Sequence, residues 1–176
     1  MKIIEVVDAL ERFAPLPLQE DYDNAGLQVG VTEAEVSGAL LCLDVTDAIL
    51  DEAIENGCNL IVSHHPLIFR KLARLTGEDY VQRVVMRAVS KGIAIVSMHT
   101  NMDAAKGGVN YKIAEKMGAE VYGTIGQLKH ATNDRGEVVS GSDGVVARFN
   151  EPLAADDFLK MLQDVFRVEC VMAGEL

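Results

Sequence analysis

The segment 61–66, Ile-Val-Ser-His-His-Pro, constrains the fold most, because a short apolar run ends there in two adjacent histidines. Aliphatic and β-branched residues between Gly57 and Pro66 are typical of a buried strand in a parallel sheet. His64 and His65 then mark the carboxyl end of that strand. Ligands of open α/β sheets bind beyond the carboxyl ends of the strands, so we expect a functional site at this position.

Extended and helical patterns alternate on both sides of this segment. The predicted elements are strands at 38–44, 59–64 and 93–98, and helices at 3–13, 47–56, 79–90 and 109–117. Strands that alternate with helices indicate parallel pairing with right-handed crossovers. The sequence therefore predicts an α/β fold with a mostly parallel sheet flanked by helices, and a site at the C-terminal ends of the strands.

Three of the four histidines gather at the ends of two predicted strands. His64 and His65 end one strand, whereas His99 and Asp103 follow the strand at 93–98. Neighbouring side chains on a strand point to opposite faces, so two adjacent imidazoles do not easily reach one ion. Two ions about 3.5–4 Å apart, bridged by a carboxylate, remove that difficulty. The alternative is that the histidines only hydrogen-bond backbone carbonyls.

One further residue is expected at this edge of the sheet, and one polar loop has two possible roles. Asp44 ends the strand at 38–44 and is expected on the same rim. The loop at 20–30 is dense in aspartate, asparagine and glycine. That composition is usual for a turn and is equally compatible with a contact to the site, so the sequence alone does not separate the two.

Composition disfavours several classes of partner and location. The chain has 27 acidic and 16 basic residues, a net charge of −11, and its basic residues are dispersed, which makes binding to nucleic acid or an anionic membrane unlikely. No apolar run is long enough to cross a bilayer, and charged residues interrupt positions 1–13, where a signal peptide would be apolar. Cys42, Cys58 and Cys170 lie apart in apolar contexts, so we expect three buried thiols in a cytoplasmic protein.

Three motifs carry a resemblance to a known family. They are Asp-Tyr-Asp-Asn-Ala-Gly-Leu-Gln-Val-Gly at 21–30, Val-Ser-His-His-Pro-Leu-Ile-Phe at 62–69 and His-Thr-Asn-Met-Asp-Ala-Ala-Lys-Gly-Gly-Val-Asn at 99–110. In this order they resemble the Nif-three-like family of dinuclear metal proteins, the type 2 homologues of GTP cyclohydrolase I, over about the first two thirds of the chain. The resemblance implies a Nif-three-like α/β fold and a ring-like homo-oligomer, commonly a hexamer.

The resemblance also implies a set of site residues. His64 and His65 would each bind one metal ion, Asp103 would bridge the two ions, and His99 would lie beside them. Independently of the resemblance, we expect His99 to act there as general acid or base. Imidazole and carboxylate ligands suit Zn, Fe, Mn and Ni alike, so the identity of the two divalent transition ions stays open. The family completes its site with a later His and Glu four residues apart, and the sequence ends at Leu176 before them, so we expect a C-terminally truncated site.

The implied activity is hydrolysis. Paired metal ions lower the pKa of a bound water and polarise the group that is cleaved. We therefore expect a dinuclear-metal-dependent hydrolase-like protein that acts on a nucleotide or another phosphoester. The alternative is a non-catalytic, metal-binding oligomeric scaffold or interaction protein, because ligands alone do not name a reaction.

The pattern is weaker towards the end of the chain. We expect a strand at 121–125, a polar turn at 127–137, a β-hairpin over 138–149, a helix at 154–166 and the start of a strand at 168–172. His130 and Asp134 share the four-residue spacing of the family's later ligands, but they lie in the polar stretch and are expected at the surface. We divide the chain into an α/β metal-binding domain, 1–125, and the start of a second, incomplete α/β segment, 126–176.

Overall fold

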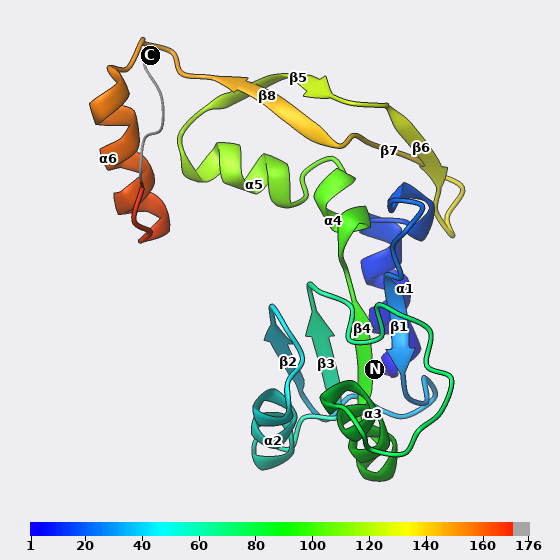
Figure 1. Ribbon diagram of the computed structural model, residues 1–176. Helices are drawn as coiled ribbons and strands as arrows, with labels where there is room; N and C mark the ends of the chain where they lie inside the picture. Colours follow the sequence, from blue (N-terminus) through cyan, green and yellow to red (C-terminus); the bar gives the residue numbers. More distant parts are fainter. Residues whose placement is uncertain (171–176) are drawn as a thin grey trace.

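The computed structural model describes residues 1–170, which form a four-stranded sheet with helices on both faces and a second group of elements beyond one end of the sheet (Figure 1). The helices are α1 (Ile3–Phe13), the 3-10 helix η1 (Leu16–Leu18), α2 (Asp47–Glu55), α3 (Tyr80–Lys91), α4 (Thr100–Ala104), α5 (Val109–Lys116) and α6 (Ala155–Phe166). The strands are β1 (Gly26–Val29), β2 (Ala39–Cys42), β3 (Leu60–Ser63), β4 (Ala94–Ser97), β5 (Glu120–Ile125), β6 (Lys129–Thr132), β7 (Val138–Gly141) and β8 (Gly144–Arg148).

The central sheet has the strand order β1-β4-β3-β2. β2, β3 and β4 are parallel to one another, whereas β1 runs antiparallel to β4. The prediction of a mostly parallel sheet is confirmed. β1 is the exception because no helical crossover joins it directly to its neighbour β4, and only such a crossover imposes the parallel direction.

Both faces of the sheet are covered, which explains the unbroken apolar run at 60–62. Leu60 packs towards α1, in a core cluster that includes Ile3. The next residue, Ile61, points to the other face and packs with Leu50 of α2 and Val84 of α3. All five side chains are fully buried. A strand buried on both faces needs apolar residues at every position rather than at alternate positions.

Local signals fix the ends of α2 and α3. Thr46 Oγ1 accepts a hydrogen bond from the backbone N–H of Ile49 at 3.3 Å, and the Asp79 carboxylate accepts one from the N–H of Gln82 at 2.8 Å. Gly92 ends α3 with φ +66°, a left-handed conformation that only glycine adopts without strain. The predicted ends of α2 and α3 are thus confirmed to within one or two residues.

The elements after β4 are paired differently from the prediction. The β-hairpin expected over 138–149 is wrong, because β7 pairs with β6, with Ala131 opposite Val139, and β8 pairs with β5. The stretch expected as a polar turn contains β6, whose Ala131 is its only buried residue. Its pairing comes from backbone hydrogen bonds, and a polar strand with one apolar contact carries little periodic signal in the sequence.

Residues Thr100–Ala104, which follow the predicted strand at 93–98, form the short helix α4. Two smaller expectations differ from the structure. The three cysteines are half-buried rather than core residues, since Cys42 lies on the edge strand β2 and Cys58 in the turn before β3. The strand expected at 168–172 has no regular structure at 168–170, and its remainder lies outside the described residues. The domain division at residue 125 stays a prediction, and β5 pairs with β8 across it.

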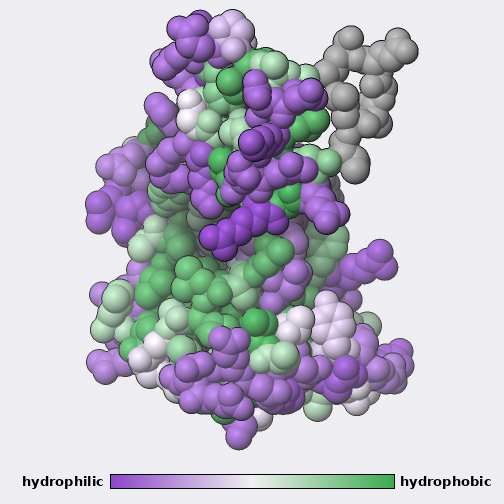
Figure 2. Space-filling model, turned by 90° about the vertical axis from the view of Figure 1, so that its left-hand side faces the viewer, coloured by the Kyte–Doolittle hydropathy of each residue, from purple (hydrophilic) through white to green (hydrophobic). Residues whose placement is uncertain are grey.

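One side of the molecule is rich in apolar surface. Seen from the side on which β2 lies, apolar groups gather across the middle of the molecule, between the sheet and the elements above it (Figure 2). β2 and the residue after it expose Leu41 and Leu43, at 77% and 59% of their maximal areas. Within residues 1–170, none of the helices combines the length and the apolar character needed to span a membrane.

Candidate metal centre

The two adjacent histidines come together because the chain bends directly after β3. Ser63 is the last residue of that strand, and its Oγ donates to the carbonyl of His65 at 2.9 Å. Ser63 and Ser97 are neighbours in the parallel register, and their buried hydroxyl groups lie 2.8 Å apart. The chain bends at His64 and His65, and the centroids of their rings lie 5.0 Å apart. The difficulty predicted for adjacent residues on a strand does not arise.

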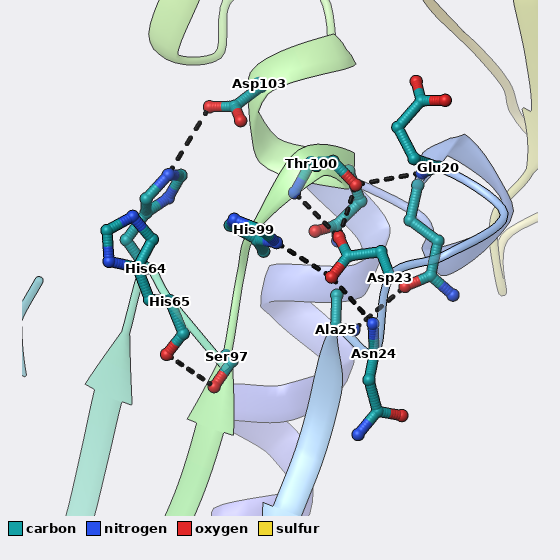
Figure 3. Close-up of polar contacts among 12 residues, drawn as sticks. Glu20, Asp23, Asn24, Ala25, His64, His65, Ser97, His99, Thr100 and Asp103 are labelled. Carbon is teal, nitrogen blue, oxygen red and sulfur yellow. Dashed lines mark hydrogen bonds and ion pairs between the residues drawn. The ribbon is translucent and has the colours of Figure 1, made fainter. Parts of the chain in front are cut away.

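The three histidines of the sheet edge form one cluster (Figure 3). The ring centroids of His64 and His65 are 5.0 Å apart, and the ring of His99 lies 5.2 and 5.5 Å from them. One ring nitrogen from each residue lies within 4.8 Å of the others. The sequence placed His99 beside the site, and the structure brings it into the same group as the other two.

His64 and His65 are each held through Nδ1 by a group that can only accept a hydrogen bond. The Nδ1 of His64 donates to the carbonyl of Met98 at 2.9 Å, and the Nδ1 of His65 to the Asp44 carboxylate at 2.8 Å. Their protons are thus on Nδ1, which leaves each Nε2 with a lone pair. In metal sites the same arrangement orients the imidazole and selects the tautomer that binds the ion. The expected place of Asp44 on this rim is confirmed.

His99 is held in the same way by Asp23, from the loop that sequence reasoning left open. The Nδ1 of His99 donates to Asp23 at 2.8 Å, and the carboxylate also accepts hydrogen bonds from the N–H of Asn24, at 2.7 Å, and from the N–H and hydroxyl of Thr100. The Asp23 side chain is fully buried. Burial alone raises the pKa of this carboxyl group, but the hydrogen bonds from Thr100, His99 and Asn24 outweigh it and the pKa lies below the ordinary value. Asp23 is therefore an ionised carboxylate fixed behind His99.

Asp103 approaches the cluster from α4. Its Oδ1 lies 3.8 Å from the Nε2 of His64. Two ligand atoms on one tetrahedral ion, each about 2.0–2.1 Å from the metal, are about 3.3 Å apart. Asp23 fixes the start of α4 through the N–H of Thr100, so the position of Asp103 depends on the same loop as that of His99.

The donor set suits a transition metal. Within the described part of the chain, no hydrogen bond occupies the Nε2 atoms of His64, His65 and His99, and Asp103 adds a partly exposed carboxylate beside them. Neutral imidazoles with a carboxylate are ligands that zinc, iron, manganese and nickel accept. The three histidines are therefore able to hold a metal ion.

His130 and Asp134 lie away from this cluster, as predicted. The Nδ1 of His130 contacts the Ser140 hydroxyl at 3.0 Å, across the β6–β7 pair. Asp134 forms an ion pair with Arg12 at 2.8 Å. Their four-residue spacing is therefore a property of the β6–β7 hairpin and not of a ligand set.

Comparisons with known proteins identify the family of this chain. Residues 1–175 match the family model Duf34/NIF3 (NGG1p interacting factor 3). A curated relative from Clostridium acetobutylicum, called GTP cyclohydrolase 1 type 2 homolog, is 30% identical over 169 residues, which are 96% of this chain and 61% of the relative. The chain thus spans about three fifths of that relative.

Solved structures have the same fold. The crystal structure of the Staphylococcus aureus hypothetical protein SA1388 matches with a TM-score of 0.80 at 28% identity, over 96% of this chain and 65% of that chain. A Bacillus cereus protein related to NIF3 matches with a TM-score of 0.66 at 35% identity, over 74% of this chain and 36% of that one. Both chains are longer than the region that they share with this one.

Proposed function

This chain belongs to the Duf34/NIF3 family, and on that premise we propose that it is a metal-dependent hydrolase-like protein acting on a nucleotide or another phosphoester. The observation that carries the proposal is the cluster of three imidazoles, each held at Nδ1 and free at Nε2, at the carboxyl ends of β3 and β4. The placement of one ring nitrogen from each of the three histidines within 4.8 Å of the others supports metal binding beyond a structural role.

We assign a role to each side chain of the centre. His64 and His65 would bind two divalent transition ions, and Asp103 would bridge them. Bound ions of this kind lower the pKa of water and polarise a phosphoryl or carbonyl oxygen. His99 would move a proton at its Nε2, because Asp23 holds the opposite nitrogen as a donor. Asp23 is a positioning residue in this scheme.

We also propose that the protein acts as a homo-oligomer, for which the resemblance implies a ring-like hexamer. The exposed apolar side chains Leu41 and Leu43 on the edge of the sheet support it, because monomers seldom leave large apolar patches uncovered. Sedimentation velocity of the wild type and of a Leu41→Ser/Leu43→Ser variant tests this. A wild type that sediments as a monomer at micromolar concentration would reject it.

The test of the centre combines metal content with turnover. We expect purified protein at pH 8 to hold up to two transition ions per chain, and to hydrolyse GTP or a model phosphodiester with Mn²⁺, Zn²⁺ or Fe²⁺. A His64→Ala/His65→Ala variant should lose the metal and at least about 100-fold of the activity, whereas the matched His130→Ala variant should keep both. Unchanged activity in the double variant rejects the hydrolase. Metal binding without turnover of any phosphoester supports the scaffold instead.

A single variant separates the two roles open to His99. If His99 transfers protons, His99→Gln should keep the metal content and lose most of the activity. If the variant loses the metal as well, His99 is a third ligand. The expected result is retention of metal, and elemental analysis of the variant after gel filtration measures it directly.

A further inference from the structure

We propose that residues 69–75, here called the cationic arm, bind the phosphate group of the substrate; the inference rests on the proposed function of the histidine cluster. The arm is part of the connection between β3 and α3, which leaves the sheet directly after the two histidines. It contains Arg70, Lys71 and Arg74, all exposed. Three cations among seven residues are a local reversal of charge in a chain with a net charge of −11.

The cations of the arm have no carboxylate partner within residues 1–170, unlike cations close by. On the neighbouring helix α3, Arg87 pairs with Asp47 at 3.1 Å and also with Asp51, and Arg83 lies 3.6 Å from Asp47. Neither Arg70, Lys71 nor Arg74 takes part in an ion pair or a side-chain hydrogen bond of the described structure. Guanidinium groups left free in this way are suited to a bidentate contact with an incoming phosphate.

The arm is held at its first end by the same loop that holds His99. The Asn24 side-chain amide donates to the carbonyl of Ile68 at 2.6 Å, and Gln28 Oε1 accepts from the N–H of Ile68 at 3.1 Å. Both backbone groups of Ile68 are thereby fixed. The following residue, Phe69, is brought to the cluster, with its ring centroid 6.3 Å from that of His99.

The second end of the arm is held by a buried glutamine. Gln82 is only 7% exposed, and its Oε1 accepts from the N–H groups of Thr76 and Gly77, at 2.9 and 3.1 Å. Between the two ends, Leu72 packs against the core beneath α2 and α3. The arm is therefore a supported structure, and its charged side chains start from fixed positions.

The arm forms one wall of a hollow of about 490 Å³, and the start of α3 forms the other. This volume lies within the range of about 300–1,000 Å³ that is usual for small-molecule sites. Glu78 and Asp79 also line the hollow, but the Asp79 carboxylate is occupied by the N–H and side chain of Gln82. The free cations thus outnumber the free carboxylates.

The hollow and the histidine cluster are continuous along the chain. Pro66, which follows His65 directly, and Phe69, which contacts the ring of His99 edge-on, both line the hollow. Phe69 thus borders both the hollow and the histidine cluster, and in this proposal a molecule whose phosphate lies on Arg70 and Arg74 would reach the histidines past Phe69. A phosphorylated small molecule fits this layout, with the charged group bound by the arm and the reacting group at the cluster.

Binding of inorganic pyrophosphate to metal-stripped protein tests the arm without requiring the centre to work. We expect isothermal titration calorimetry to show binding to the wild type, and affinity at least 10-fold lower in an Arg70→Ala/Lys71→Ala/Arg74→Ala variant. A Lys91→Ala/Arg135→Ala/Lys160→Ala variant removes the same charge from exposed positions elsewhere and should stay within two-fold of the wild type.

The outcomes separate the arm from the proposed function. The His64→Ala/His65→Ala variant should bind pyrophosphate like the metal-stripped wild type, even where it has lost metal and turnover. An equal loss of affinity in the two triple variants would show general charge attraction and would overturn the inference. Absence of pyrophosphate binding to wild type at millimolar concentration would overturn it as well, whatever the metal content and activity prove to be.

Discussion

The helices α1 and α6 are both amphipathic, yet they are packed very differently. α1 buries Ile3 and Val7 against the sheet, whereas no residue of α6 is fully buried and its Phe158 contacts Phe149 at a centroid distance of 6.0 Å. The same contrast separates residues 1–118, which hold nearly all of the core, from residues 119–170. Amphipathic spacing decides that a helix forms, but the surface that covers its apolar face decides how much that helix stabilises the protein.

Two ion pairs join the second region to the first. Lys129 lies 2.5 Å from Glu20 of the N-terminal region, and Asp134 pairs with Arg12 of α1. Ala131 and Val139 of the β6–β7 pair are its apolar anchor in the core beneath α1. The histidine cluster is built entirely on the first region, so we expect the centre to be as stable as the sheet and the attached elements to open more easily.

The largest expected effect comes from a leucine-to-alanine substitution, which we compare between the two regions. Leu60→Ala empties a fully buried site between the sheet and α1 and should lower the free energy of unfolding by about 2–5 kcal/mol. Leu162→Ala, on the half-buried face of α6, should lower it by less than about 1 kcal/mol. Urea denaturation followed by circular dichroism measures both. Equal losses would show that α6 is packed as firmly as the sheet.

Metal binding should increase the difference in stability between the two regions, because the proposed ligands all lie in the first region. Zinc at 100 times its dissociation constant should stabilise the folded protein by about 2.7 kcal/mol at pH 8. Imidazole binds metal only as the neutral base, so the gain should be smaller in acid than at pH 8. Thermal denaturation with and without zinc measures it. His130→Ala, in the second region, should keep the gain, and its loss there would contradict the assignment of the cluster.

The same difference between the two regions explains which parts of the structure could be predicted from the sequence. Continuous apolar runs such as 60–62 and the helical spacing of apolar residues at 47–56 and 79–90 are local signals, and they predicted the sheet and its helices well. The pairing of β6 with β7 left no such signal, because only Ala131 of β6 is buried. Asp23 was missed as a partner of His99 because a contact across 76 residues cannot be inferred from a loop whose composition is also that of a turn.

Asp23 gives the third prediction, of intermediate size. Hydrogen bonds to a buried ionised group contribute about 1.5–3 kcal/mol, so Asp23→Asn should cost about 2 kcal/mol. Since the pKa of Asp23 is lowered in the folded protein, its contribution is complete above the unfolded pKa of about 3.9 and is lost as the pH falls through the lower folded value. The difference in unfolding free energy between wild type and variant should shrink as the pH falls below about 4. Asp21→Asn, at an exposed neighbour, is the matched control and should show neither effect.

The smallest expected effect concerns the ion pair between Arg12 and Asp134, which links the two regions. Arg12 holds Asp134 with two hydrogen bonds, of 3.0 and 2.8 Å, and thereby lowers the pKa of that carboxyl group. Asp134→Asn should speed amide exchange in β6 and β7 and leave β3 unchanged, because an exposed pair stabilises only its surroundings. In the wild type the Arg12–Asp134 ion pair should weaken with added salt. It should also weaken as the pH falls below about 4, through the lowered pKa of Asp134. Asp156→Asn on α6, whose carboxylate forms no ion pair in the described part of the chain, should change neither strand pair. If exchange in β3 rises together with that in β6, the two regions open as one unit, and the higher stability inferred for the histidine cluster is wrong.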